Sequence, residues 1–356
     1  QQQQQQQRHN IRGISYKKDD TKCDIFNGKW VYKEEEEPMY NTKTCPFLEV
    51  GVTCQSNGRP DFDYVKWRWE ATDCDIPLFN GEDMLEKLKN KRMIIVGDSI
   101  NRNMWESLAC LLYSSIPSSS AEVVEMAAYR MLKAKNYNFT LEFYMTPFLV
   151  EVNKKHKSGR RVLILDRISS FSKQWKGADI MVFNSAHWWT HGDAIKGWDL
   201  FSYKGKLVEN LPRNIAYKRG MRTWASWINK NINPTKTSVY FRSVSPSHFN
   251  PHFCYNATQP IMDESYTLRF PRSLINVIEN LTQKMNKLGV KYMNITKLSE
   301  YRMDAHPSVY TTKIQNNSKV PGPDCSHWCL PGLPDTWNRL LYASILLDSL
   351  KKFPTS

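Results

Sequence analysis

The sequence has no run of 18 or more apolar residues, the length that a helix needs to cross a bilayer. It has no recognisable secretory signal peptide, no internal repeat and no nucleic-acid-binding motif. It also has no Cys-x-x-Cys pair, a spacing typical of structural zinc sites. These absences disfavour nucleic-acid binding and a structural metal, and we expect any membrane anchor to lie outside this chain.

The composition is that of a globular protein. Of 356 residues, 41% are hydrophobic and 24% charged, which allows one large domain and a smaller one. The net charge is +14, and lysine and arginine are scattered along the chain, which favours an acidic polymer or a phosphorylated donor over nucleic acid and leaves a purely solubilising role equally open. The 12 tryptophans and 17 tyrosines fit aromatic core packing, carbohydrate stacking, or both.

Cysteines and glycosylation sequons together indicate an oxidising, glycosylating compartment. The eight cysteines, an even number, favour disulfides, with zinc as the weaker alternative. They are Cys23, Cys45, Cys54, Cys74, Cys110, Cys254, Cys325 and Cys329. The sequon asparagines are Asn138, Asn256, Asn280, Asn294 and Asn316. The sequence leaves the pairing open, although we expect Cys325 and Cys329 each to bond a distant cysteine, one of them in the N-terminal block.

Three regions follow one another along the chain. Residues 1–20 are polar, begin with seven glutamines, and are expected to be a disordered linker. Residues 21–80 hold half of the cysteines and little periodicity, which predicts a small, loop-rich module held by disulfides. Residues 81–356 alternate apolar strands with amphipathic helices and form the expected catalytic domain.

This alternation predicts an α/β fold with a central parallel sheet flanked by helices. Strands are expected at residues 92–97, 162–166, 178–184, 237–244 and 290–295. Helices are expected at residues 103–113, 220–231, 271–288 and 335–350. In such a sheet, ligands bind at the carboxyl ends of the strands. Gly97-Asp98-Ser99, Asn184 and Ser245 all fall at those ends.

Ser99 is the candidate nucleophile. It stands where a strand turns into a helix, and a helix N-terminus offers free N–H groups to an oxyanion. Gly97 permits the sharp turn, and Asp98 either caps the helix or orients the site. Taken alone, the tripeptide favours a plain helix cap over a nucleophile.

Asp324 and His327 favour catalysis over capping. Nucleophile, carboxylate and base in the order Ser, Asp, His are what acyl transfer through a serine ester requires. Cys325 and Cys329 frame the segment and would fix the loop that carries the base. Asp304 and His306 are a rival pair, which we interpret as structural or substrate-contacting.

Other candidates are weaker. Asn184 could donate to the oxyanion, or it could be an ordinary turn asparagine; Arg102 and Arg167 are possible helpers. Trp188, Trp189 and His187 could line a sugar groove. A metal site built from His187, His191, His248 and His252 is disfavoured because no carboxylate pattern accompanies them.

Gly97-Asp98-Ser99 with a late Asp-x-x-His resembles the SGNH (GDSL-like) esterase and acyltransferase superfamily. The longer string at residues 324–332 (DCSHWCLPG), continuing to Asp335-x-Trp337-Asn338, resembles the plant trichome birefringence-like family of polysaccharide O-acetyltransferases. Residues 57–61 (NGRPD) and 67–69 (WRW) resemble that family's N-terminal domain. Within the family, the eskimo-type xylan O-acetyltransferase is the most similar.

The resemblance implies an SGNH-hydrolase-like, flavodoxin-like domain with Ser99, His327 and Asp324 as a triad. It also implies a Golgi type II membrane protein whose lumenal part acetylates cell-wall polysaccharide. The expected donor is acetyl-CoA, no cofactor is expected to be bound, and the expected acceptor is xylan or glucuronoxylan. Two rivals stay open: an acetyl-polysaccharide esterase with the same triad, and a non-catalytic polysaccharide-binding protein. The sequence does not indicate the oligomeric state.

Overall fold

The computed structural model describes residues 23–192, 195–249, 253–263, 265–266, 270–312 and 322–352. The expectations for residues 1–20, His252 and Asn316 lie outside the described residues. The four sequon asparagines that are described are all exposed.

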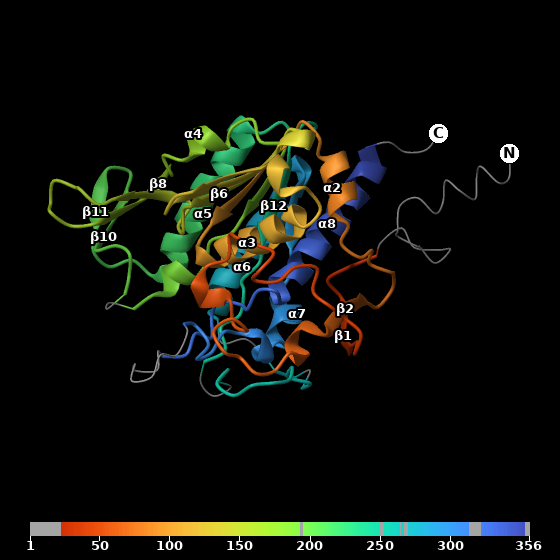
Figure 1. The fold of residues 1–356 in the computed structure, drawn as a ribbon. Coiled ribbons are helices and arrows are strands. Elements are labelled where there is room, and N and C mark those ends of the chain that lie inside the picture. The colour runs from red at the N-terminus through yellow and green to blue at the C-terminus, as the bar shows by residue number, and fades with distance from the viewer. Residues whose placement is uncertain are drawn as a thin grey trace.

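A seven-stranded sheet forms the centre of the molecule, in the order β13-β12-β9-β3-β6-β5-β4 (Figure 1). The first five of these strands are parallel, and β5 and β4 continue the sheet antiparallel. The strands are β3 (Arg92–Gly97), β4 (Ala121–Glu125), β5 (Tyr129–Ala134), β6 (Phe139–Met145), β9 (Ile180–Phe183), β12 (Ser238–Arg242) and β13 (Val290–Met293). The predicted α/β class, a central sheet flanked by helices, is confirmed.

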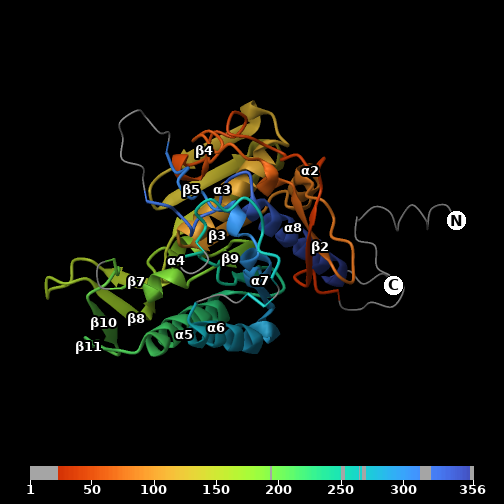
Figure 2. The same cartoon turned by 90° about the horizontal axis from the view of Figure 1, so that it is seen from below.

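Helices cover both faces of this sheet (Figure 2). Met93 and Ile95 of β3 point into the core on the side of α3 and α8, whereas Ile94 and Val96 point into the core on the side of α5 and α6. Burial on both faces explains why the strand is a continuous apolar run. The helices are α2 (Gly81–Lys87), α3 (Ser99–Tyr113), α4 (Ser172–Trp175), α5 (Arg213–Asn231), α6 (Arg272–Lys284), α7 (Thr296–Glu300) and α8 (Leu333–Lys352).

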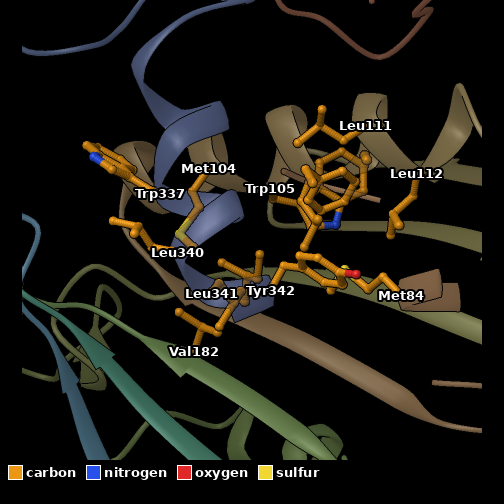
Figure 3. Packing of buried hydrophobic residues seen from close by; sticks show 14 of the residues in the cluster. Met84, Met104, Trp105, Leu111, Leu112, Val182, Trp337, Leu340, Leu341 and Tyr342 are labelled. Carbon is orange, nitrogen blue, oxygen red and sulfur yellow. The ribbon is translucent and has the colours of Figure 1, made fainter. Parts of the chain in front are cut away.

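The packing of α3 against α8 fixes the helix that begins at Ser99 (Figure 3). Met104 and Trp105 of α3 lie in one buried cluster with Trp337 and Leu340 of α8. The Trp105 indole N–H donates to the carbonyl of Leu141 in β6, 3.1 Å away. Fully burying side chains of this size contributes roughly 1.5–3 kcal/mol each, so α3 is held rigidly over the sheet.

The predicted strand at residues 162–166 is formed but belongs to a different sheet. It is part of β8 (Val162–Ile168), in a four-stranded sheet ordered β11-β10-β8-β7 at one side of the molecule (Figures 1 and 2). Its partners are β7 (Val150–Asn153), β10 (Leu200–Tyr203) and β11 (Lys206–Val208). The place beside β3, on the side away from β9, is taken by β6, where the sequence analysis predicted no strand. A short apolar run shows that a strand is buried, but not which sheet it joins.

The predicted helices also form, with shifted ends. The first begins at Ser99 rather than at residue 103, because Asp98 caps it. The predicted helix at 271–288 is α6 followed by a 3₁₀ turn, Met285–Leu288, and it ends at Gly289 in the left-handed region, with φ of 74°.

The N-terminal block contains a two-stranded sheet of β1 (Gly28–Tyr32) and β2 (Trp67–Ala71). Disulfides join Cys23 to Cys74, Cys45 to Cys110 and Cys54 to Cys329. Trp30 and Trp69 lie in the same buried cluster as α3 and α8, and the Trp30 indole donates to the carbonyl of Leu298 at 2.7 Å. The block is therefore packed into the main core. In the part of the chain that is described, no helix has the length and hydrophobicity to span a membrane.

Candidate active site

The turn that carries Ser99 is built by local sequence. Asp98 caps α3 by accepting hydrogen bonds from the backbone N–H groups of Ile100 and Asn101, at 2.9 and 3.4 Å. A Cβ atom on Gly97 would lie 1.8 Å from Oδ1 of Asn184, so only glycine fits there. Ser99 is therefore the first residue of a 15-residue helix, at the carboxyl end of a central strand.

Asn184 links the end of β9 to this turn. Its Oδ1 accepts from the Asp98 backbone N–H at 3.2 Å, and its Nδ2 donates to Asp98 Oδ2 at 3.0 Å. We predicted Asn184 as an oxyanion donor or a turn residue. In the structure its side-chain amide is hydrogen-bonded to Asp98. Asn184 therefore stabilises the turn that carries Ser99.

Arg242 is a buried residue of this region that the sequence analysis missed. It ends β12, is 1% exposed, and donates through Nε to Asn101 Oδ1 at 2.8 Å. Its Nη2 lies 4.0 Å from Asp98 Oδ1. Burial lowers the pKa of Arg242 to about 10, against the opposing effect of Asp98, so the guanidinium stays charged at neutral pH. Its position at a strand's carboxyl end was the available signal.

The structure brings the three predicted triad residues into one hydrogen-bonded chain. Nε2 of His327 lies 2.7 Å from Oγ of Ser99, and Nδ1 of His327 lies 2.8 Å from Oδ2 of Asp324. Ser99 and His327 are 228 positions apart in the sequence. This geometry allows His327 to take a proton from Ser99 while Asp324 fixes the imidazole tautomer.

Asp324 is held as a carboxylate. Burial opposes its ionisation, but three hydrogen bonds outweigh that effect: one from His327 Nδ1, and one each from the backbone N–H groups of His327 and Ser326 at 2.9 Å. They lower the pKa of Asp324 well below its ordinary range. The carboxylate is therefore negatively charged across the physiological pH range and can stabilise an imidazolium at His327.

Long-range contacts fix the loop that carries Asp324 and His327. Disulfides join Cys325 to Cys254 and Cys329 to Cys54, which confirms that both bond distant cysteines and that one of these lies in the N-terminal block. Asn103 of α3 accepts from the Trp328 backbone N–H at 2.8 Å and donates to its carbonyl at 3.1 Å. One helix thus holds both the nucleophile and the base loop.

The arginines suggested as helpers are engaged elsewhere. Arg102 pairs with Glu49 at 2.9 Å and approaches Glu106 at 3.9 Å, one turn further along α3. Arg167 is exposed on β8, in the second sheet. Neither prediction holds in this structure, because a residue near Ser99 in sequence, or at a strand end, need not point toward Ser99.

The residues predicted to line a sugar groove differ in their exposure. Trp189 is only 1% exposed, packs against Tyr217, and donates its indole N–H to Ser185 at 2.8 Å, so it is a core residue and not a sugar-contacting one. Trp188 is partly exposed, beside His191. His187 donates through Nε2 to the carbonyl of Ser245 at 2.6 Å, and burial lowers its pKa.

The remaining histidines do not form a metal site in the described residues, where no cluster of three or more His, Cys, Asp or Glu side chains is arranged to hold an ion. His248 and His306 instead contact one another in the interior. Asp304, the other member of the rival pair, is paired with Arg302 at 2.9 Å. Asp304 and His306 therefore do not act as a second dyad.

Comparison with known proteins agrees with this architecture. Residues 76–344 match the PC-esterase family, described as a GDSL/SGNH-like acyl-esterase family found in Pmr5 and Cas1p. Residues 21–75 match the PMR5 N-terminal domain. The fold and the serine-bearing turn thus define a GDSL/SGNH-like protein of the acyl-esterase or acyl-transfer type.

Similarity to individual proteins identifies the family more closely. The chain is 42% identical to Arabidopsis thaliana trichome birefringence-like 6 over 91% of its own length and 70% of the relative's. It is 40% identical to trichome birefringence-like 1, covering 62% of that protein, and 40% identical to trichome birefringence-like 40, covering 88%. The chain belongs to the trichome birefringence-like family.

Proposed function

We propose that this chain is a polysaccharide O-acetyltransferase that acetylates xylan in the Golgi lumen, as part of a type II membrane protein. The hydrogen-bonded chain from Ser99 through His327 to Asp324 carries the proposal. Family membership supports acyl chemistry in general. Exposed sequon asparagines and four disulfides support a lumenal compartment.

The proposed mechanism is a two-step transfer. His327 Nε2 takes the Ser99 proton as Oγ attacks the carbonyl carbon of acetyl-CoA. The C–S bond breaks, the departing CoA sulfur takes the proton from His327 and leaves as the thiol, and acetyl-Ser99 forms. A xylosyl O-2 or O-3 hydroxyl then loses its proton to His327 and attacks the ester carbonyl. The proton returns to Ser99 Oγ as the acetylated sugar leaves.

Two features of the site serve these steps. In the first turn of α3 the N–H groups of Ile100 and Asn101 are bonded to Asp98, so the oxyanion donor that we propose at this helix N-terminus is the backbone N–H of Ser99. One such donor is worth about 10²–10³-fold in rate. The negative charge of Asp324 favours the His327 imidazolium that exists during each step.

A basic hairpin supports an acidic acceptor such as glucuronoxylan. The turn between β7 and β8 reads KKHKSGRR at residues 154–161, and Lys154, Lys155 and Lys157 are exposed on it. Arg161 on the same turn pairs with Asp199 at 2.8 Å. This local concentration of positive charge, which differs from the scattered distribution expected from the sequence, suits the uronic acid carboxylates of a polysaccharide.

The central experiment is mass spectrometry of a xylo-oligosaccharide incubated with acetyl-CoA and the protein, with the Ser99→Ala protein alongside. We expect acetyl mass to be added by the wild type and not by the variant. Acetate release from acetylated xylan, without transfer, would identify an esterase. Transfer at the wild-type rate by Ser99→Ala would contradict the covalent route, and inactivity in both assays would favour a binding protein.

Substitutions in the basic hairpin test whether the acceptor is acidic. Replacing Lys154, Lys155 and Lys157 with glutamine should raise KM for glucuronic-acid-substituted xylan and leave KM for neutral xylo-oligosaccharide unchanged. The matched control replaces three exposed lysines on or beside α5 and α6: Lys230, Lys236 and Lys284. An equal change in both triple variants would assign the effect to net charge rather than to the hairpin.

A further inference from the structure

His248 and His306 form a buried pair directly behind the base loop. Their side chains are 0% and 1% exposed, and Nδ1 of His248 lies 2.7 Å from Nε2 of His306. The other nitrogens face backbone carbonyls: His248 Nε2 lies 2.7 Å from the carbonyl of Glu300, and His306 Nδ1 lies 2.6 Å from that of His327. The pair thus connects the backbone of Glu300, at the end of α7, to the backbone of His327, the candidate base.

These four distances determine how many protons the pair holds. A carbonyl oxygen only accepts, so His248 Nε2 and His306 Nδ1 must both carry hydrogen. If both rings were neutral, the two facing nitrogens would then both be bare, and two lone pairs would oppose each other at 2.7 Å. A hydrogen bond between them needs one additional proton. The network therefore assigns three N–H groups to two rings, which is one imidazole and one imidazolium.

Within the pair, a charge on His306 is disfavoured. Burial and the neighbouring His248 together lower the pKa of His306 well below its ordinary value, so we assign the neutral acceptor to His306 and the additional proton to His248. Burial also opposes the charge on the pair, but aromatic rings face it. The His248 ring is stacked over Tyr266 with centroids 5.9 Å apart, and the His306 ring is stacked on Trp328 at 3.8 Å.

Charged groups on the described segments around the pair also contribute. Asp324 attracts a proton toward His306, whereas His327 opposes one. Arg59 donates to the His306 carbonyl at 3.1 Å, beside its own partner Asp61. Among the residues that the structure describes, the adjoining segments also carry the pairs Lys297–Glu300 and Arg302–Asp304, together with Tyr266.

We propose that His248 and His306 are a proton-sharing positioning pair: His306 holds the backbone of His327, and the link is intact only while His248 is an imidazolium. The effect on catalysis rests on the proposed function of His327 as the base. Neither ring needs to touch the substrate. The pair acts through the His327 carbonyl and so through the placement of the His327 ring against Ser99.

The sign of the pH dependence follows. The protonated pair is the form that makes all three hydrogen bonds, so its stabilisation of the loop is present at low pH and is lost once rising pH removes the additional proton. The reaction itself has the opposite requirement, since any general base must be neutral in order to accept a proton. The two limbs of an activity profile are thus assigned to different histidines.

The first measurement needs no variant. Long-range ¹H–¹⁵N NMR of the histidine rings in the intact wild-type protein at pH 6 counts protonated ring nitrogens, and His248→Gln and His306→Asn spectra assign them. We expect three N–H nitrogens in the pair, with one proton strongly deshielded in the short N–H···N bond. Two N–H nitrogens only, one on each ring, would overturn the proposal.

The second measurement follows the rate at which a fluorophosphonate probe labels Ser99 between pH 5 and pH 9, which requires the triad but no sugar. The labelling rate of the wild type should fall at both ends of this pH range, which gives the profile an acid limb and an alkaline limb. His306→Asn should label roughly 10–100-fold more slowly, and His248→Gln should keep the acid limb and lose the alkaline one. An alkaline limb that persists unchanged in His248→Gln contradicts the proposal, with thermal unfolding of each variant as the folding control. Failure of the proposed function itself would look different, because no protein would be labelled at any pH while the NMR result stood.

Discussion

The two sides of the candidate active site are built in opposite ways. The nucleophile side is local: β3, Gly97, the Asp98 cap and α3 are consecutive, and sequence neighbours make most of the turn. The base side is a loop with little regular structure. Disulfides to Cys54 and Cys254, the side chain of Asn103 and the carbonyl of Ala305 hold it from outside. A helix cap shapes the first side, whereas distant contacts shape the second.

The largest expected effect is on the base side. Asp324→Asn keeps the size of the side chain but removes the negative charge and allows the wrong His327 tautomer. We expect the rate of Ser99 labelling to fall by about 10⁴-fold, with a small change in thermal stability. Labelling kinetics with a parallel melting curve measure this, and a near-normal rate would show that Asp324 does not orient the base.

Two disulfides allow a matched comparison. Replacing both Cys54 and Cys329 with serine removes a bridge to the base loop, and replacing both Cys23 and Cys74 removes one within the N-terminal block. Each should cost about 2–4 kcal/mol of unfolding free energy. Only the first should slow Ser99 labelling in the folded protein, because Cys329 lies two positions after His327. Equal slowing in both, in denaturant titration and labelling assays, would refute a local role.

Asn103→Asp tests the link between the two sides. The aspartate still accepts from the Trp328 N–H but no longer donates to the Trp328 carbonyl. We expect a loss of roughly 1–3 kcal/mol in stability and up to about 10²-fold in labelling rate, since the base loop shifts relative to Ser99. The comparison variant is Asn338→Asp, which alters a buried amide bonded to Met104 and Ser107 deeper along α3. It should lower stability without slowing labelling.

The smallest effect should come from Glu106 in the interior of α3. Burial, with repulsion from Glu49, raises its pKa to about 8 against the attraction of Arg130. Folding therefore favours the protonated acid: this contribution to stability is present below the ordinary carboxyl pKa and is lost as pH rises through about 8. Each pKa unit corresponds to about 1.4 kcal/mol.

Glu106→Gln should flatten the fall in melting temperature between pH 5 and pH 9 and leave Ser99 labelling nearly unchanged. Unfolding curves across that range measure the first effect. A variant whose melting temperature falls as steeply as that of the wild type would assign the pH dependence to another group. A large change in labelling would show that the nucleophile side depends on the interior of α3 as well as on its cap.

The sequence by itself determined much of this protein. The α/β class and the strand ending at Gly97 follow from apolar runs and turn residues, because these are near-neighbour effects. Ser99, Asp324 and His327 were named from their motifs, and tertiary structure alone decided that they meet. Tertiary structure also decided that residues 162–166 join a second sheet, that Arg102 pairs with Glu49 and that Trp189 lies in the core. The bond between His248 and His306 had no local signal, and Arg242 offered only its place at a strand's carboxyl end, since each contact depends on side chains that folding brings together from separate elements.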